Sequence, residues 1–276
     1  MDKKDIIASV VMGVYNDETF IEQSMNSIIS QLTDDMELVV VDDCSSDKTQ
    51  CILQKYANAD PRINLIINSE NQGVGYCAYI GVKEAKGKYI IRMDSDDISF
   101  PDRFQKQIQF LEENSEIDIV GAFAIEIDEN NNKGIMRTMP ITHDEIVNSI
   151  WACPIIQPAV AFRREKIILA GNYNPKLRRR IDYELWFRCL ASGLRFTNIP
   201  EPLVYYRFTP NSHRKQSLKL AFEQAKIGWE GCKMLDLPTW QYLAVAVPIF
   251  RAIFPPSISH LIYRSLSFFD PRKKQK

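Results

Sequence analysis

Short apolar runs and amphipathic segments alternate along the first hundred residues. Runs of strand length, rich in β-branched residues, occupy residues 6–14, 37–41, 63–67 and 89–93. Between them, apolar side chains recur at helical spacing over residues 16–32, 45–56 and 73–86. Repeated strand–helix units joined by right-handed crossovers build a parallel sheet with helices on both faces. The pattern therefore predicts an α/β fold.

The second half of the chain is more mixed. An amphipathic helix is expected after Pro101, and residues 117–127 followed by a polar turn at 130–134 predict a hairpin. Residues 154–162 are compatible with a strand or a loop, and 182–192 with a helix. Residues 196–206 are expected to form extended segments interrupted by Pro200 and Pro202.

Polar side chains follow each of the first four predicted strands. They lie at residues 15–18, 42–43, 68–71 and 94–97. In an open parallel sheet the ligand binds beyond the carboxyl ends of the strands. We expect these four segments to share one binding edge.

Composition and charge narrow the class of protein. The chain has 276 residues, of which 45% are hydrophobic and 25% are charged, values that exclude global disorder. The formal net charge of −1 argues against nucleic acid as a partner, because a polyphosphate backbone requires a basic surplus. We expect one catalytic domain with an appendage.

The six cysteines have no zinc-type spacing and are expected to be free thiols in a reducing compartment. The charged N-terminus leads into a run of strand length, without the apolar core of a signal peptide. Both features predict a cytoplasmic protein.

Three carboxylates crowd the segment Asp94-Ser95-Asp96-Asp97. Neighbouring carboxylates repel one another unless a cation lies among them, and hard oxygen ligands suit Mg²⁺ or Mn²⁺. The alternative is a solvated turn in which Asp97 and Ser99 cap the helix after Pro101.

Asp42 and Asp43 end another hydrophobic strand and are candidates for accepting hydrogen bonds from a nucleotide base. Asp47, a few residues later, is more typical of a helix cap.

Taken in order, these segments resemble the family 2 glycosyltransferases, which are inverting enzymes with the GT-A fold. The matching stretches are residues 9–18, 37–49, 71–73, 87–97 and 181–188. The resemblance extends from residue 6 to about residue 207. It implies a Rossmann-like, mostly parallel sheet flanked by helices, with a C-terminal helical appendage.

The resemblance also implies a donor site and a metal site. Asp42 would lie at the base, Asp94 near the ribose, and Asp96 together with Asp94 on Mn²⁺ or Mg²⁺. The other residues expected to border the nucleotide sugar are Val14, Tyr15, Asn16, Glu18, Asp43, Asn71, Gly73, Arg92 and Ser95.

Asp182 is the candidate catalytic base, because the attacking hydroxyl must lose its proton on the face opposite the leaving group. In the family, a Glu-Asp pair opens a helix in the second half and its Asp is the base; here Ile181 replaces the Glu. The alternative is that Asp182 only caps the helix and that Glu184 acts as the base.

The sequence departs from the family pattern at three places. Gly13 replaces a usual proline, and no histidine follows Arg207 at the usual distance, which leaves His213 as a doubtful substitute. Ala78-Tyr79 replaces a common Arg-Asn pair. An arginine for the donor would then come from Arg92 or from the triplet Arg178-Arg179-Arg180, which could equally be a solvated loop.

The function implied is transfer of one sugar, from a UDP-sugar to a hydroxyl of a lipid-linked saccharide, in surface polysaccharide or O-antigen biosynthesis. Residues 1–212 would be the catalytic domain, with 1–100 binding the nucleotide sugar and 101–212 the acceptor. The alternatives are a nucleotidyltransferase that makes nucleotide sugars, although the first strand end lacks a glycine-rich phosphate loop, and a non-catalytic nucleotide-sugar binding module.

Residues 213–276 are expected to form a helical, membrane-associating segment. The apolar stretch 240–269 is broken by Pro248, Arg251 and Arg264, so it is too short to span a bilayer. With the basic tail 272–276 it predicts peripheral contact with the inner face of the cell membrane. The alternative is that it packs on the catalytic domain.

Overall fold

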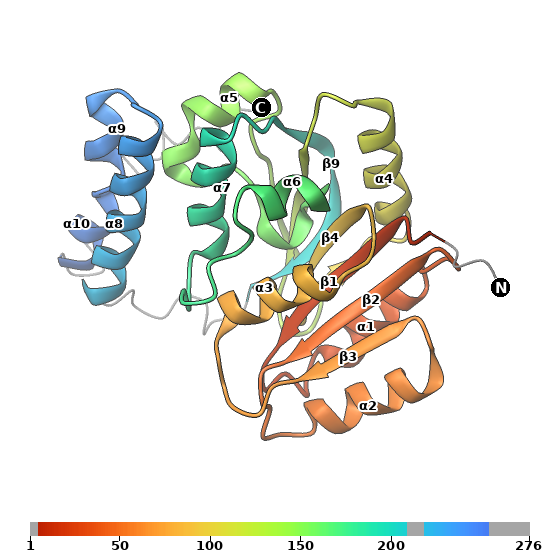
Figure 1. Ribbon diagram of the computed structural model, residues 1–276. Helices are drawn as coiled ribbons and strands as arrows, with labels where there is room; N and C mark the ends of the chain where they lie inside the picture. Colours follow the sequence, from red (N-terminus) through yellow and green to blue (C-terminus); the bar gives the residue numbers. More distant parts are fainter. Residues whose placement is uncertain (1–4, 209–217, 254–276) are drawn as a thin grey trace.

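A computed structural model describes residues 5–208 and 218–253. The expected strand–helix alternation is present in the first hundred residues (Figure 1). The strands are β1 (Ala8–Val14), β2 (Met36–Asp42), β3 (Ile63–Ile67) and β4 (Tyr89–Asp94). The helices between them are α1 (Ile21–Ile29), α2 (Thr49–Ala59) and α3 (Val74–Glu84).

Two of these helices begin later than their periodicity predicts. Residues 17–20 form a turn in which the Asp17 carbonyl accepts from the N–H groups of Phe20 and Ile21, so α1 starts at Ile21. Asn16 has a left-handed φ of 50°, which stops the helix from extending further back. Similarly, residues 45–48 form a loop, and α2 starts at Thr49.

The second half adds short and antiparallel elements. Its strands are β5 (Ile98–Ser99), β6 (Ile119–Ile127), β7 (Lys133–Arg137), β8 (Ala161–Arg163) and β9 (Phe196–Arg207). Its helices are α4 (Arg103–Glu113), α5 (His143–Asn148), α6 (Arg164–Leu169) and α7 (Ile181–Ala191), with 3-10 turns η1 (Ile150–Ala152) and η2 (Gln157–Ala159). The predicted hairpin is β6–β7, which pair antiparallel.

One mixed sheet runs through the molecule in the order β3-β2-β1-β4-β8-β6-β9-β5, with β7 beside β6. The four strands from β3 to β4 are parallel, β8 is antiparallel to both neighbours, and β6 and β9 are parallel. Strand β9 continues through Pro200 and Pro202, contrary to the expected interruption. Its pairing with β6 shifts register between Ala122 and Ala124, which accommodates the prolines.

Helices cover both faces of the sheet, as predicted. Val10 and Met12 pack with residues of α1, α2 and α4, whereas Val11 packs with residues of α3, α5, α6 and α7. This alternation follows from the period-2 geometry of β1. Since every residue of β2 is buried, the parallel part of the sheet is a two-sided core.

Three further helices, α8 (Leu218–Met234), α9 (Thr239–Ala244) and α10 (Val247–Ile253), form a layer outside α7 (Figure 1). Gly228 and Gly231 allow α8 to approach α7 closely, because a Cβ on either would overlap the side chain of Tyr183 or Phe187. No helix among residues 5–208 and 218–253 is long and apolar enough to cross a membrane. The basic tail, His213 and residues 254–269 of the apolar stretch lie outside the described residues.

Candidate functional site

Strands β1 to β4 end at one edge of the sheet. In the parallel register Val14 lies opposite Asp42, Gly13 opposite Asp94, and Asp42 opposite Ile67. The loops that follow these strands therefore meet, as their polar residues predict.

Asp42 and Asp43 follow β2 but differ in their hydrogen bonding. Asp43 accepts from the backbone N–H groups of Gln72 (2.8 Å) and Gly73 (2.7 Å). It also accepts from the Asn68 side chain (2.8 Å). Asp42 is fully buried, and its Oδ1 has no hydrogen-bond partner among the described residues. Asp43 thus closes the loop after β3, whereas Asp42 retains an acceptor that a base N–H can satisfy.

The loop after β1 is fastened to the loop after β2. The Asn16 N–H donates to Ser45 Oγ (2.9 Å), and Asn16 Oδ1 accepts from the Ser46 N–H (2.7 Å). Glu18 Oε2 accepts from the Lys48 N–H (2.9 Å). Both predicted donor-site side chains therefore hold the edge of the site together. Tyr15 lies between Asn16 and the buried Val14 and is exposed on this rim.

Arg178, although distant in the sequence, contacts the loop after β3, which contains the predicted donor-site residues Asn71 and Gly73. Its guanidinium donates to the Asn71 side-chain oxygen (2.7 Å) and to the Asn71 carbonyl (3.0 Å). Its aliphatic part lies against Gly73, where φ is +95° and a Cβ would clash with it. Ala78, which occupies the family's arginine position, is buried in the core. Of the arginines considered from the sequence, Arg178 is therefore the one in contact with the predicted donor loop.

Arg92 is buried beneath the site. Only 1% of its surface is exposed, and it donates to the Val11 carbonyl (2.8 Å). Its guanidinium lies 3.8 Å from Asp94 Oδ1 and over the ring of Tyr173. The sequence predicts that Arg92 borders the nucleotide sugar; in the structure its side chain is enclosed, and its guanidinium contacts Asp94, another of the predicted donor-site residues.

The acidic run after β4 is held by a residue that the sequence analysis did not assign to the site. The Arg207 N–H donates to Asp97 Oδ1 (2.7 Å), and Arg207 Nε donates to the Asp96 carbonyl (2.7 Å). Asp102, and neither Asp97 nor Ser99, occupies the position before α4, and its side chain makes no capping bond. The acidic run is therefore not the cap of that helix.

Burial and mutual repulsion govern the charges in this run. Burial, with the carboxylates of Asp94 and Asp17 adding to it, raises the pKa of Asp96 to about 7. Burial also raises the pKa of Asp94, which Arg92 opposes and Asp182 increases. One oxygen each of Asp17 and Asp97 has no partner among the described residues. The protein thus leaves a cluster of carboxylates short of positive charge.

Asp17 is the second residue missed from the sequence. Its carboxylate forms a hydrogen bond with Ser95, and burial raises its pKa. It lies in the turn after β1, where an acidic residue before a helix indicates favourable interaction with the helix dipole. Only the register between β1 and β4 brings it to the acidic run.

Asp182 is the second residue of α7 and does not cap it. The cap position is Arg180, in a left-handed conformation with φ of 54°. Asp182 lies close enough to Asp94 to raise the pKa of that carboxyl. The Cys153 thiol lies 3.5 Å from Asp182 Oδ2 and donates to it. The predicted base therefore lies near the acidic run at the end of β4, and it contacts Cys153, which no sequence signal indicated.

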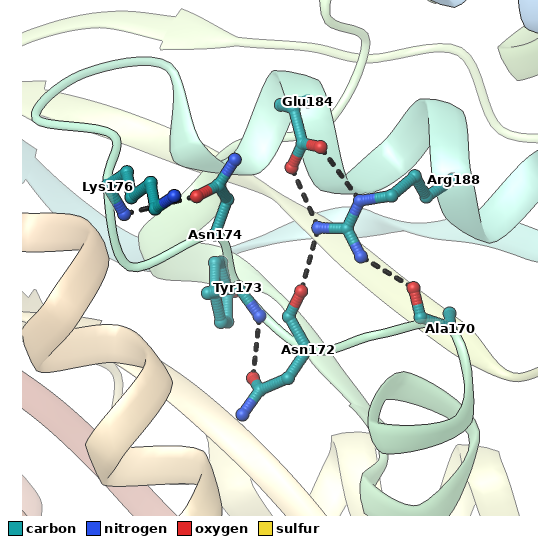
Figure 2. A network of polar contacts seen from close by, with 7 residues as sticks. All are labelled: Ala170, Asn172, Tyr173, Asn174, Lys176, Glu184 and Arg188. Atoms are coloured by element: carbon teal, nitrogen blue, oxygen red, sulfur yellow. Dashed lines mark hydrogen bonds and ion pairs between the residues drawn. The ribbon is translucent and has the colours of Figure 1, made fainter.

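Glu184, the alternative base, belongs to a separate network (Figure 2). Its two oxygens accept from Arg188 Nε (2.8 Å) and from a terminal nitrogen of Arg188 (2.7 Å). The same arginine donates to the Asn172 carbonyl (2.7 Å). Both oxygens of Glu184 are bonded to Arg188 and hold this arginine where it fastens α7 to the preceding loop, so Glu184 is poorly placed to act as a base.

A family model described as glycosyl transferase family 2 matches residues 9–181. EpsE of Bacillus subtilis (strain 168), assigned as a glycosyltransferase, is 30% identical over 259 residues, which cover 93% of this chain and 92% of EpsE. An Escherichia coli UDP-Gal:alpha-D-GlcNAc-diphosphoundecaprenol beta-1,3-galactosyltransferase is 26% identical over 267 residues, covering 94% and 95%.

Solved structures show the same fold. TarS of S. aureus in complex with UDP-GlcNAc has a TM-score of 0.70 at 21% identity, over 94% of this chain and 75% of that chain. The mannosyltransferase PcManGT from Pyrobaculum calidifontis, in complex with GDP-Man and Mn²⁺, has a TM-score of 0.59 at 15% identity, over 95% and 79%. The predicted GT-A fold is confirmed.

Proposed function

The chain belongs to glycosyl transferase family 2, and from this premise we propose that it moves one sugar, with inversion, from a UDP-sugar to a hydroxyl of a lipid-linked saccharide. The observation that carries the proposal is that Asp182 lies close enough to Asp94, at the carboxyl end of β4, for its charge to raise the pKa of Asp94. A base on one side and donor-binding carboxylates on the other are what a single displacement at an anomeric carbon requires.

In the proposed donor site, Asp42 accepts an N–H of the base through Oδ1, which has no hydrogen-bond partner within residues 5–208 and 218–253. Val14, Tyr15, Asn71 and Gly73 border the nucleotide, with Asn16, Glu18 and Asp43 holding their loops. Arg178, already bonded to Asn71, supplies positive charge beside the diphosphate. Residues 1–100 form this half, and residues 101–212 form the acceptor half.

The acidic run fits a divalent cation. Asp96, whose pKa burial and neighbouring carboxylates raise to about 7, and Asp94 would hold Mn²⁺ or Mg²⁺. Among the residues that the structure describes, no group of three or more Cys, His, Asp or Glu side chains is arranged to hold a metal by itself. Mg²⁺ is usually bound by one or two carboxylates together with substrate phosphates. Such a cation, when bound, neutralises the charge that develops on the leaving diphosphate.

The remaining steps fall to the chain's own residues. Asp182 takes the proton from the attacking acceptor hydroxyl, and Cys153 holds its carboxylate. Arg92 stabilises the ionised form of Asp94 from below. Arg207 keeps the acidic run at the end of β4 in place through its bonds to Asp96 and Asp97.

The names of similar proteins support the donor and acceptor classes. TarS was solved with UDP-GlcNAc, and the E. coli relative is named for UDP-Gal and a diphosphoundecaprenol-linked sugar. We propose a UDP donor and a lipid-linked acceptor in surface polysaccharide or O-antigen synthesis, and hence action at the inner face of the cell membrane.

A donor screen tests the proposal. The purified chain is incubated with a panel of UDP-, GDP- and dTDP-sugars and with Mn²⁺ or Mg²⁺, and release of the nucleoside diphosphate is followed. Slow hydrolysis of a UDP-sugar, absent in Asp96→Ala, is expected. Release from only another nucleotide class would contradict the UDP assignment, and an undiminished rate in chelator would contradict the metal.

A further inference from the structure

Helix α8 has an exposed stripe of alternating basic and aromatic residues. The stripe consists of Lys219, Phe222, Lys226, Trp229 and Lys233. Their spacing of three and four residues places them on one face of the helix. All five are exposed; Phe222 retains 57% and Trp229 54% of its surface. We refer to these five residues as the lysine–aromatic stripe.

The opposite face of α8 accounts for the contact with the catalytic domain. Ala221, Ala225, Gly228, Gly231 and Cys232 are buried, and the two glycines lie against Tyr183 and Phe187 of α7. The lysine–aromatic stripe therefore is not needed for packing on α7. Exposed aromatic rings of this size lose the benefit of burial unless another surface covers them.

Residues of α9 extend the apolar part of this surface. The Trp229 ring meets the Tyr242 ring edge-on, with centroids 4.8 Å apart. Trp240 and Leu243 of the same helix are 50% and 73% exposed. In Figure 1, α8 to α10 form one end of the molecule, with α7 between them and the sheet and with β3 and α2 at the opposite end.

We infer that the lysine–aromatic stripe docks on an anionic lipid surface. Tryptophan and phenylalanine enter the headgroup region, and the three lysines attract acidic headgroups, which is the combination found on interfacial helices. A second copy of this chain is disfavoured as the occupant, because the lysines of two stripes would repel. Glu223 and Glu230 lie at one flank, but the Lys226–Glu230 contact is 3.9 Å and solvent-exposed, so it neutralises little.

This inference goes beyond the proposed transfer reaction and assigns a membrane contact to α8, which lies within the segment 213–276 that the sequence predicts to associate with a membrane. It also orients the chain, since α7 and the candidate base Asp182 then lie on the membrane side of the nucleotide-binding strands. Because docking needs no donor or metal, it stands or falls independently of the proposed function.

The test is co-sedimentation of the full chain with vesicles of phosphatidylcholine alone or mixed equally with phosphatidylglycerol. Binding to the mixed vesicles is expected, with weak binding to phosphatidylcholine. Replacing all three stripe lysines (Lys219→Gln, Lys226→Gln and Lys233→Gln) should weaken binding about a hundredfold, since each lysine near an anionic surface contributes roughly fivefold. The matched control replaces exposed lysines elsewhere (Lys55→Gln, Lys83→Gln and Lys133→Gln) and should bind as the wild type does.

A second variant tests the aromatic part. Phe222→Ser with Trp229→Ser should reduce vesicle binding while the circular dichroism spectrum and the thermal unfolding midpoint stay as in the wild type, which shows that the fold is intact. Three outcomes would overturn the inference: absence of wild-type binding, equal loss in the control, or binding to an acidic polysaccharide in place of vesicles. A concentration-dependent dimer that the Phe222→Ser and Trp229→Ser variant abolishes would also overturn it, in favour of self-association.

Discussion

At the end of β2, Asp43 receives hydrogen bonds from Gln72, Gly73 and Asn68, whereas in the acidic run at the end of β4 Asp97 Oδ2 has no partner among the described residues. Both segments are acidic strand ends at the same edge of one sheet, so their composition alone does not separate them. The difference lies in the donors that the fold supplies. A carboxylate that the protein satisfies stabilises a loop, and one that it leaves short of donors or cations is available to a ligand.

The strongest test of this distinction concerns Asp182 and Glu184. Asp182→Asn should reduce transfer about a thousandfold, since a general base contributes roughly 10²–10⁴ in rate, while donor affinity stays within twofold. Glu184→Gln, which removes charge from the network with Arg188, should retain transfer and lower the thermal midpoint. Steady-state turnover and donor calorimetry provide the readout. Reversal of the two phenotypes would assign the base to Glu184.

The substitution Asp96→Asn tests the acidic run at the end of β4. Loss of a charged ligand group costs about 1.5–3 kcal/mol, so Mn²⁺-dependent donor binding should weaken roughly 10- to 100-fold. Asp102→Asn is the matched control, because Asp102 lies a few residues away and pairs with Lys106 on the surface. Titration of a UDP-sugar with and without Mn²⁺ measures both. Equal metal dependence in wild type and Asp96→Asn would remove Asp96 from the metal site.

The pair Asp43→Asn and Asp42→Asn tests the end of β2, where Asp43 is fully hydrogen-bonded and Asp42 Oδ1 has no partner among the described residues. Asp43→Asn should lower the free energy of unfolding by about 2 kcal/mol, because buried donors of the loop after β3 lose a charged acceptor. Asp42→Asn should leave stability nearly unchanged and weaken donor binding about tenfold. Urea unfolding and donor titration separate the two. The comparison fails if Asp42→Asn is the more destabilised variant.

The smallest expected effect is the loss of stability in Asp47→Asn, and this loss depends on pH. Although burial opposes it, hydrogen bonds from the Thr49 side chain and from the N–H groups of Thr49 and Glu18 lower the pKa of Asp47 below its usual value. Its stabilisation is therefore present above pH 4 and is lost as the pH falls through the lowered pKa. Asp47→Asn should be less stable by under about 1 kcal/mol at pH 6, and this gap should close near pH 3. A gap that is constant with pH would exclude the ionised carboxylate as its cause.

The spacing of apolar residues along the chain was sufficient to predict much of the fold. The β-branched runs placed β1 to β4, and helical spacing placed α1 to α3 between them, because period 2 and period 3.6 are properties of neighbouring residues. Boundaries were less accurate where a loop competes: Ser45, Ser46 and Lys48 bond to the loop after β1, and the helix begins only at Thr49. No periodicity can report a partner thirty residues away.

The sequence by itself determined the α/β fold, the family, and the edge of the sheet at which polar residues gather. Only the tertiary structure decided which of those residues have a carboxyl oxygen available to a ligand and which use their oxygens in hydrogen bonds that hold loops. The hydrogen-bond partners that decide this are far away in the sequence. Arg178 bonds to Asn71 across 107 residues, Arg207 to Asp96 across 111, and Cys153 to Asp182 across 29. Each carboxylate's role therefore depends on donors brought to it by the packing of other elements, and residue type at a strand end carries no information about them.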